Sequence, residues 1–415
     1  MSNITMTELP ETKGEWLNYT KKYGMLDPLH TSIHDANYDT NSGSRGGDQQ
    51  ILGLRVLWPA PKIPMFPSFL STEAPQIVPQ KYLSWAESRL RRLDCWNAFV
   101  RWVKDKPESL ATPAGERLGP FALVYQSHTY TQVLNGNDDY TKLDFSPIAT
   151  RTRARVALSS QPLRPQTPST PTPLRTGEEL VGTPSAMDID QYEEMMDETM
   201  SSPVSIPQVD SPATGEEAKH AGGANNEQEV VISAVQMQRS VCLHVEEVQK
   251  AKWTADQEEF TVRDNGGKKV FTAKTDGALH IDPDTQIYQI TETKKAHRYT
   301  REIIAARVKG QESCQMSALI ASHPPPNLQQ MREKGLTHRR ILHSHGKDEI
   351  YLTVGSYGAA YVDYIRHQPA ELSFLTMQEY GPFHTKSWKA MEAYTILLLA
   401  LTLEEIDRFK GVAHV

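Results

Sequence analysis

The sequence has 415 residues, of which 38% are hydrophobic and 23% are charged, and its length allows two or three domains. Its formal net charge of -7 excludes a basic chain that binds nucleic acid through overall charge alone. The charge is uneven, because residues 1–157 carry 18 basic and 16 acidic side chains, residues 158–229 carry 3 and 13, and residues 230–415 carry 23 and 22. The excess acid therefore lies in the middle segment, and local basic clusters in the two flanking parts are the places where phosphate could bind.

The cysteine spacing and the length of the apolar runs indicate the cellular compartment in which the protein is expected. Three widely spaced cysteines, Cys95, Cys242 and Cys314, predict a reducing compartment and neither a disulfide framework nor a Cys-based zinc site. The opening residues lack the apolar core of a signal peptide, and the longest apolar run, Ile396–Leu403, falls far short of the roughly 20 residues that span a bilayer. We expect an intracellular protein, nuclear or cytoplasmic, with no membrane partner.

Residues 1–157 are expected to form a helical and irregular N-terminal region. A helix is predicted from about Lys81 to Lys106, because large apolar residues recur there at helical spacing. This stripe comprises Tyr82, Trp85, Leu93, Trp96, Val100 and Val103. Such a stripe is more typical of core packing than of a platform for stacking bases.

Residues 158–227 are predicted to be a disordered acidic linker, because they are rich in Pro, Ser and Thr, poor in aromatic residues and without periodicity. Six hydroxyl residues there precede a proline: Thr167, Thr170, Thr172, Thr183, Ser202 and Ser211. They suggest a proline-directed kinase as a partner. The alternative is that such pairs are simply common in a segment of this composition.

Residues 228–415 carry the periodic patterns expected of a folded domain. The predicted elements are a helix at 229–252, strands at 259–264, 270–281 and 286–294, a helix at 299–322, strands at 339–345 and 349–354, and a last helix at 386–409. Turn residues separate the strands, at 265–267 and again at 282–285. The order is α-β-β-β-α-β followed by more helix, which predicts an α+β fold.

Three polar residues of these strands are the strongest candidates for chemistry. Glu292 and Lys294 are two apart on one strand and therefore share a face, whereas Thr293 points the other way. Asp276 lies on the preceding strand, and a loop of three or five residues would place it opposite Glu292. A two-residue turn would instead set it opposite Thr291, on the wrong face.

Two neighbouring carboxylates favour a hard divalent cation, Mg²⁺ or Mn²⁺, which would be held by Asp276 and Glu292. Such an ion polarises a phosphoryl oxygen and lowers the pKa of bound water. Lys294 could orient that water or stabilise negative charge that develops on the phosphate. Together these groups predict hydrolysis of a phosphodiester bond.

Asp276 followed by Glu292-Thr293-Lys294, on consecutive strands of this order, resembles the PD-(D/E)XK nucleases, a superfamily with a restriction-endonuclease-like core. More specifically, the chain resembles the nuclease-like domains of fungal proteins, and the tracts Asp348–Ile365 and Phe374–Phe383 look like the closing part of such domains. The resemblance covers roughly residues 228–410. It implies a metal-dependent nuclease whose partner is nucleic acid, with DNA favoured over RNA.

Carried over by position, the resemblance makes Asp276 and Glu292 metal ligands and Lys294 the catalytic lysine. An assisting acid on the first helix would match Glu246 or Glu247, between which the sequence does not choose. Residues Gln311 and Gln315 have the spacing of a Gln and a Tyr that follow the lysine strand in some related nucleases, with Gln in place of Tyr. A basic run that begins at the site is interpreted as a phosphate-binding rim, comprising Lys295, Arg298, Arg301 and Arg307.

Two alternatives stay open. Without the strand order, the Asp and Glu-x-Lys pattern is weak, and a surface salt bridge of Glu292 with Lys294 or Lys274 would explain it. The second alternative is a catalytically inactive nuclease fold that acts in protein or nucleic-acid binding. The negative net charge and the absence of a Tyr after Gln311 favour this second alternative.

Overall fold

The computed structural model describes residues 6–25, 32–35, 43, 46–105, 118–133 and 215–413, with the backbone alone at 133, 215–226, 412 and 413. Residues 158–214 of the expected linker, with its proline-directed motifs, lie outside the described residues. Residues 1–146 and 223–415 form one unit and residues 147–222 another, and the strands of the described structure belong to the first unit. In the part described, no helix is long and apolar enough to cross a membrane.

The chain has a mixed α+β fold. The helices are α1 (Lys13–Lys22), α2 (Asp48–Gly53), α3 (Phe69–Thr72), α4 (Ala74–Ile77), α5 (Gln80–Leu90), α6 (Asp94–Asp105), α7 (Phe121–Val133), α10 (Gly215–Leu243), η3 (Glu246–Val248), α11 (Glu302–Ser322), α12 (Leu328–Lys334), α13 (Ala359–Ile365) and α14 (Trp388–Ala413). The strands are β1 (Val56–Leu57), β2 (Ala251–Thr254), β3 (Glu259–Arg263), β4 (Lys269–Lys274), β5 (Gly277–Ile281), β6 (Ile287–Lys294), β7 (Thr337–Gly346), β8 (Glu349–Gly358) and β9 (Leu375–His384).

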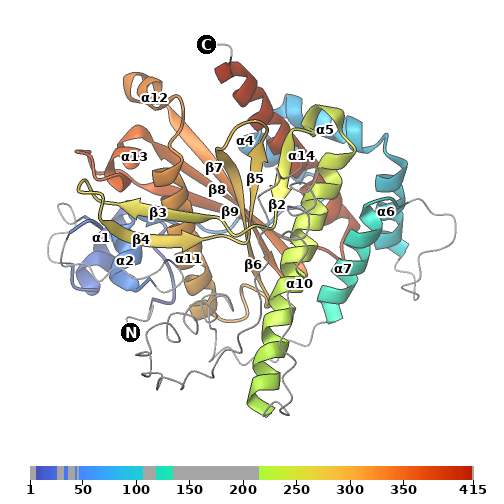
Figure 1. Cartoon of the computed structure of the whole chain (residues 1–415), viewed down its shortest axis with the longest axis horizontal. Coiled ribbons are helices and arrows are strands. Elements are labelled where there is room, and N and C mark those ends of the chain that lie inside the picture. Colours follow the sequence, from blue (N-terminus) through green and yellow to red (C-terminus); the bar gives the residue numbers. More distant parts are fainter. Residues whose placement is uncertain are drawn as a thin grey trace, which may run out of the picture. The chain divides into compact units, whose positions relative to one another are not determined.

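A seven-stranded sheet lies at the centre of the fold, in the order β1-β9-β8-β7-β6-β5-β2 (Figure 1). The pairs β6–β7 and β1–β9 are parallel, and the other neighbours are antiparallel. Helices α11 and α12 connect β6 to β7, as a parallel pair requires a long crossover. Strands β3 and β4 form a separate two-stranded sheet.

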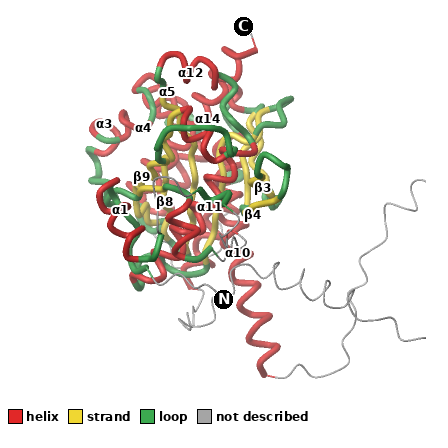
Figure 2. Tube along the Cα trace, turned by 90° about the vertical axis from the view of Figure 1, so that its left-hand side faces the viewer, coloured by secondary structure: helices red, strands yellow, loops and turns green. Residues whose placement is uncertain are grey.

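Helices pack on both faces of the main sheet (Figure 2), because the strands carry apolar side chains on both sides. On one face, Leu279 and Ile341 join a core with α3–α7, α10 and α14. On the other face, their neighbours Ala278 and Leu342 join a core with α2, α11, α13 and the β3–β4 pair. Alternation along β6 thus divides its polar residues between the two faces as well.

The N-terminal residues are part of this unit. Strand β1 pairs with β9, and Trp58 donates its indole N–H to Ser313 of α11 at 2.9 Å. The stripe predicted between 81 and 106 packs in the core, with Tyr82, Trp96 and Val103 buried. The single helix predicted there is wrong in one respect, because the chain breaks at 91–93 into α5 and α6.

The C-terminal predictions hold for β3, β6, β7, β8, α11 and α14, with shifts at their ends. The helix predicted to reach residue 252 ends at Leu243 and is followed by η3 and β2. The strand predicted at 270–281 is in fact two strands in different sheets, β4 and β5. Strand β9 was not expected at all.

Candidate active site

The pairing of β5 with β6 brings the two predicted acids near each other. Gly277 pairs with Thr291, and Asp276, in the bend just before β5, donates its backbone N–H to the Thr291 carbonyl at 3.0 Å. Its carboxylate is close enough to raise the pKa of Glu292. The connection from β5 to β6 spans 282–286, but the first residues to pair across it are His280 and Ile287, so loop length alone does not set the register. Glu292 lies on the sheet face that α11 covers, in the same alternation as the buried Ile290.

A β-bulge, which the sequence did not reveal, fixes this register. Near the turn His280 pairs with Ile287, a register that would set Asp276 opposite Thr291 if it continued. The register shifts by one at this point, with Tyr288 as the extra residue on β6. Since a shift of one residue exchanges the faces of a strand, the bulge decides where the acid lies.

Asp276 lies where the chain passes from β4 into β5. Its Oδ2 atom accepts hydrogen bonds from the N–H of Thr293 at 2.9 Å and from the Thr293 hydroxyl at 2.8 Å. The carboxylate thereby satisfies a backbone donor beyond the end of β5. Among the described residues, no donor reaches its other oxygen, Oδ1, which leaves that atom open to a ligand.

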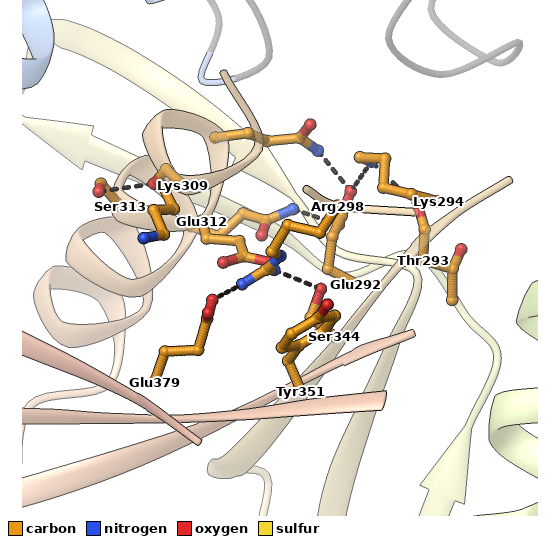
Figure 3. A network of polar contacts seen from close by, with 12 residues as sticks. Glu292, Thr293, Lys294, Arg298, Lys309, Glu312, Ser313, Ser344, Tyr351 and Glu379 are labelled. Atoms are coloured by element: carbon orange, nitrogen blue, oxygen red, sulfur yellow. Dashed lines mark hydrogen bonds and ion pairs between the residues drawn. The ribbon is translucent and has the colours of Figure 1, made fainter. Parts of the chain in front are cut away.

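Glu292 is almost fully buried and receives three donors (Figure 3). Its Oε1 atom accepts from the Lys294 ammonium and from Gln311 Nε2, the latter at 2.6 Å. Its Oε2 atom accepts from Gln315, which also donates to the carbonyl of Lys274 at 2.7 Å. The two glutamines of α11 therefore meet the lysine strand as their spacing suggested, and this ion pair is buried rather than the surface salt bridge of the alternative interpretation.

The charged groups of this centre are buried close together, and this shifts their pKa values. Burial and the neighbouring Asp276 raise the pKa of Glu292 to about 8, although Lys294 and Gln315 lower it. Burial alone would lower the pKa of Lys294, but the carboxylates of Glu292, Glu227 and Asp276 raise it above its usual value. Lys294 therefore stays protonated, and its ammonium is the common cationic neighbour of the three acidic groups.

The acid supplied by the first helix is Glu227 of α10, whose Oε1 atom lies 4.0 Å from the Lys294 ammonium. Burial raises the pKa of Glu227, Asp276 raises it further, and the lysines at 294 and 295 oppose this. The expectation of Glu246 or Glu247 is wrong, because α10 ends before them and both belong to η3. Glu247 instead forms an ion pair with Arg89 of α5.

A second buried group lies beside this centre. Arg298 forms ion pairs with Glu312 of α11 and Glu379 of β9, and it donates to the Ser344 hydroxyl at 2.7 Å. Figure 3 shows it beneath the Glu292 centre, with Tyr351 against its guanidinium. Its side chain is only 3% exposed, so the prediction that Arg298 belongs to a phosphate-binding rim is wrong.

The other three residues of the predicted rim reach the surface. Lys295 is partly exposed, and it is close enough to Glu227 to lower the pKa of that carboxyl. Arg301 is exposed at the N-cap of α11, and Arg307 is partly exposed one helical turn before Gln311. These positions are compatible with phosphate contact.

The donor set suits a hard cation, because every candidate ligand is an oxygen. Asp276 Oδ1 is open, and the side-chain oxygens of Gln311 and Gln315 are buried without a hydrogen-bond partner. In the arrangement described, however, no three acidic, His or Cys side chains are close enough to hold an ion by themselves. A metal would therefore depend on Asp276 and Glu292, with water or phosphate completing its shell.

Sequence reasoning missed Glu227 and the Arg298 group. Glu227 stands at the end of the acid-rich segment, where one more acid carries no signal. Glu379 lies within the tract that supported the family resemblance, and a charged residue between Met377 and Tyr380 was the available sign of a buried polar role.

The fold and this site define a mixed α+β protein with a buried carboxylate–lysine centre at the junction of β5, β6 and α11. No protein-family model, curated protein or solved structure matches the chain.

Proposed function

We propose that this chain is a metal-dependent nuclease that hydrolyses phosphodiester bonds of nucleic acid, with a fold of the PD-(D/E)XK type. The observation that carries the proposal is the proximity of Asp276 and Glu292 at the end of the β5–β6 pair, with Lys294 bound to Glu292. Buried acids of like charge beside a lysine are costly to fold and are typical of sites selected for chemistry.

Each side chain of the site would have its own role. Asp276 Oδ1 and Glu292 would hold Mg²⁺ or Mn²⁺, which supplies a polarised phosphoryl oxygen and a water of lowered pKa. Lys294 would turn its ammonium from Glu292 toward the phosphate and stabilise the charge that develops there. Gln311 and Gln315 would keep Glu292 in place, while Lys295, Arg301 and Arg307 would contact neighbouring phosphates.

The test compares cleavage of plasmid and single-stranded DNA by the full chain with Mg²⁺, with Mn²⁺ and with a chelator. The full chain is needed because residues 1–146 belong to the same unit. Lys294→Ala is expected to lower the rate by at least about a hundredfold, the scale of losing a charge-stabilising group. The matched control is Lys252→Ala, which removes a surface lysine that pairs with Asp282. Equal rates for wild type and Lys294→Ala would end the assignment.

A second candidate is a nuclease fold without turnover that acts in binding. The favouring observation is that Lys294, Gln311 and Gln315 already occupy both oxygens of Glu292. Thermal unfolding in Mn²⁺ separates the two, because an ion that binds only the folded state raises the melting temperature. The nuclease predicts a rise for wild type and none for Asp276→Asn, and the binding module predicts no rise in either.

A further inference from the structure

The loop that follows β6 carries a half-exposed aromatic ring beside the proposed site. Tyr299 is 45% exposed although its hydroxyl donates to the fully buried Glu379. The hydroxyl end points inward, and the exposed area belongs to the rest of the residue. The edge contact with Tyr351, at 5.9 Å between centroids and 63° between planes, holds the ring from within.

A lysine lies next to this ring without a carboxylate partner in hydrogen-bonding contact. The Lys309 ammonium is 5.4 Å from the Tyr299 centroid and 5.3 Å from that of the buried Trp58. None of the described acidic side chains forms an ion pair with it. Burial lowers its pKa and Arg298 lowers it further, against the opposing influence of Glu379, Glu312 and Glu11. Such an ammonium is ready to take an anion from outside.

The Arg298 group lies between the candidate active site and the pair formed by Tyr299 and Lys309. Glu379 binds both the Tyr299 hydroxyl and Arg298, and Arg298 binds Glu312, which follows Gln311 and lies three residues after Lys309 on α11. Figure 3 shows Lys309 on one side of Arg298 and the Glu292–Lys294 pair on the other. The ring is thus held by Glu379 and Tyr351 before any ligand arrives, and Glu312 of the same group is close enough to Lys294 for that ammonium to lower its pKa.

We propose that Tyr299 and Lys309 form a subsite for one unpaired nucleotide that flanks the scissile phosphate, with the base stacked on the ring and its phosphate on the ammonium. A paired base hides both faces within the duplex, so a protruding ring stacks only on a base that is unpaired or flipped out. The inference rests on the proposed nuclease function and narrows its substrate to single-stranded or locally unpaired nucleic acid.

Binding is measured by fluorescence anisotropy with the full chain in chelator, so that no strand is cut. The probes are a short single-stranded oligonucleotide, the same strand with one abasic site moved stepwise along it, and the fully paired duplex. Wild type is expected to prefer the single strand and to lose about tenfold in affinity when the abasic site reaches the stacked position. Tyr299→Ala should show the same tenfold loss with the intact strand and no further loss at that abasic position.

Two variants distinguish the contribution of the Tyr299 ring from that of the Lys309 charge. Tyr299→Phe keeps the stacking surface and should bind the intact strand within about threefold of wild type, well below the loss expected on removing the ring. Lys309→Gln should lower the slope of log affinity against log salt by about 0.7, the contribution of one phosphate contact on a single strand. Tyr130→Ala, which removes a ring 49% exposed on α7, is the matched control and should change neither quantity.

The outcomes distinguish the two proposals. If wild type binds the strand and Tyr299→Ala binds it equally well, the subsite is refuted and the nuclease proposal stands. If wild type cleaves DNA with Mg²⁺ or Mn²⁺ but binds no strand in chelator, the subsite alone is refuted. If it neither binds nor cleaves nucleic acid, the nuclease proposal is refuted together with the subsite that rests on it.

Discussion

Arg298 is held among carboxylates that no solvent reaches, and this makes its removal costly. Replacing it by Met would leave Glu312 and Glu379 buried without a cation. We expect Arg298→Met to lower the free energy of unfolding by about 3–5 kcal/mol in urea titrations. The triple variant with Glu312→Gln and Glu379→Gln should recover most of that loss. A loss below about 1 kcal/mol for the single variant would contradict a buried ion group at Arg298.

His128 of α7 is a buried histidine whose protonation should destabilise the fold at acid pH. Its side chain is buried, neither ring nitrogen has a hydrogen-bond partner, and burial lowers its pKa to about 4. A histidine that binds its proton more weakly when folded contributes full stability above the unfolded pKa of about 6.5, and this is lost as the pH falls toward the folded value.

The variant His128→Phe removes this titration. Any steric effect of the larger ring is the same at both pH values and cancels in the comparison. Relative to wild type, the variant should therefore gain about 2 kcal/mol of unfolding free energy between pH 7 and pH 5. Urea unfolding at the two pH values measures this, and parallel pH profiles for the two proteins would refute it.

At the scale of elements, the close approach of β2 and β5 depends on a glycine. A Cβ atom on Gly277 would lie 2.6 Å from the carbonyl oxygen of Thr254, a contact that backbone cannot relieve without moving a strand. Gly277→Ala should destabilise the fold by about 2 kcal/mol and reduce activity, because β5 also carries Asp276 into place. Gly358→Ala is the matched control, since a Cβ there meets nothing within 4 Å. Equal unfolding free energies for the two variants would count against this packing.

The same region shows where sequence periodicity stops being informative. Strands β6, β7 and β8 were predictable because their alternation is long and uninterrupted. The break between β4 and β5 was not, because apolar alternation continues through 271–281 although the chain changes sheets at Asp276. Strand β2 was hidden because Val245 and Val248 extend the helical spacing of α10 almost to its first residue.

Some residues of the candidate site could likewise be predicted from the sequence, and others could not. The adjacency of Glu292 and Lys294 follows from strand alternation alone, and the position of Asp276 near them follows only once the register of β5 with β6 is known. Arg298 could not be assigned, because a basic run has the same pattern whether it is solvated or buried. Its environment is decided by Glu379, which is 81 residues away along the chain.

At the scale of the whole molecule, the N-terminal residues contribute to the same unit as the candidate site. Besides the β1–β9 pairing, the hydroxyl of Tyr361 donates to the carbonyl of Leu54 at 2.9 Å. We expect a chain lacking residues 1–133 to lose its sharp thermal transition, because the apolar surface that these residues cover would face water. Near-UV circular dichroism during heating measures this. An unchanged melting temperature would instead show that the C-terminal part folds independently.

The nuclease proposal requires that Glu292 act through its charge and not only through its packing. The variant Glu292→Gln keeps the size of the side chain but removes the anion that accepts from Lys294, Gln311 and Gln315. The full chain should therefore unfold at a lower temperature than wild type, and cleavage is compared at a temperature where both proteins are folded. Metal-dependent cleavage of DNA should nevertheless fall by at least about a hundredfold. A folded Glu292→Gln protein that cleaves at the wild-type rate would contradict the proposal.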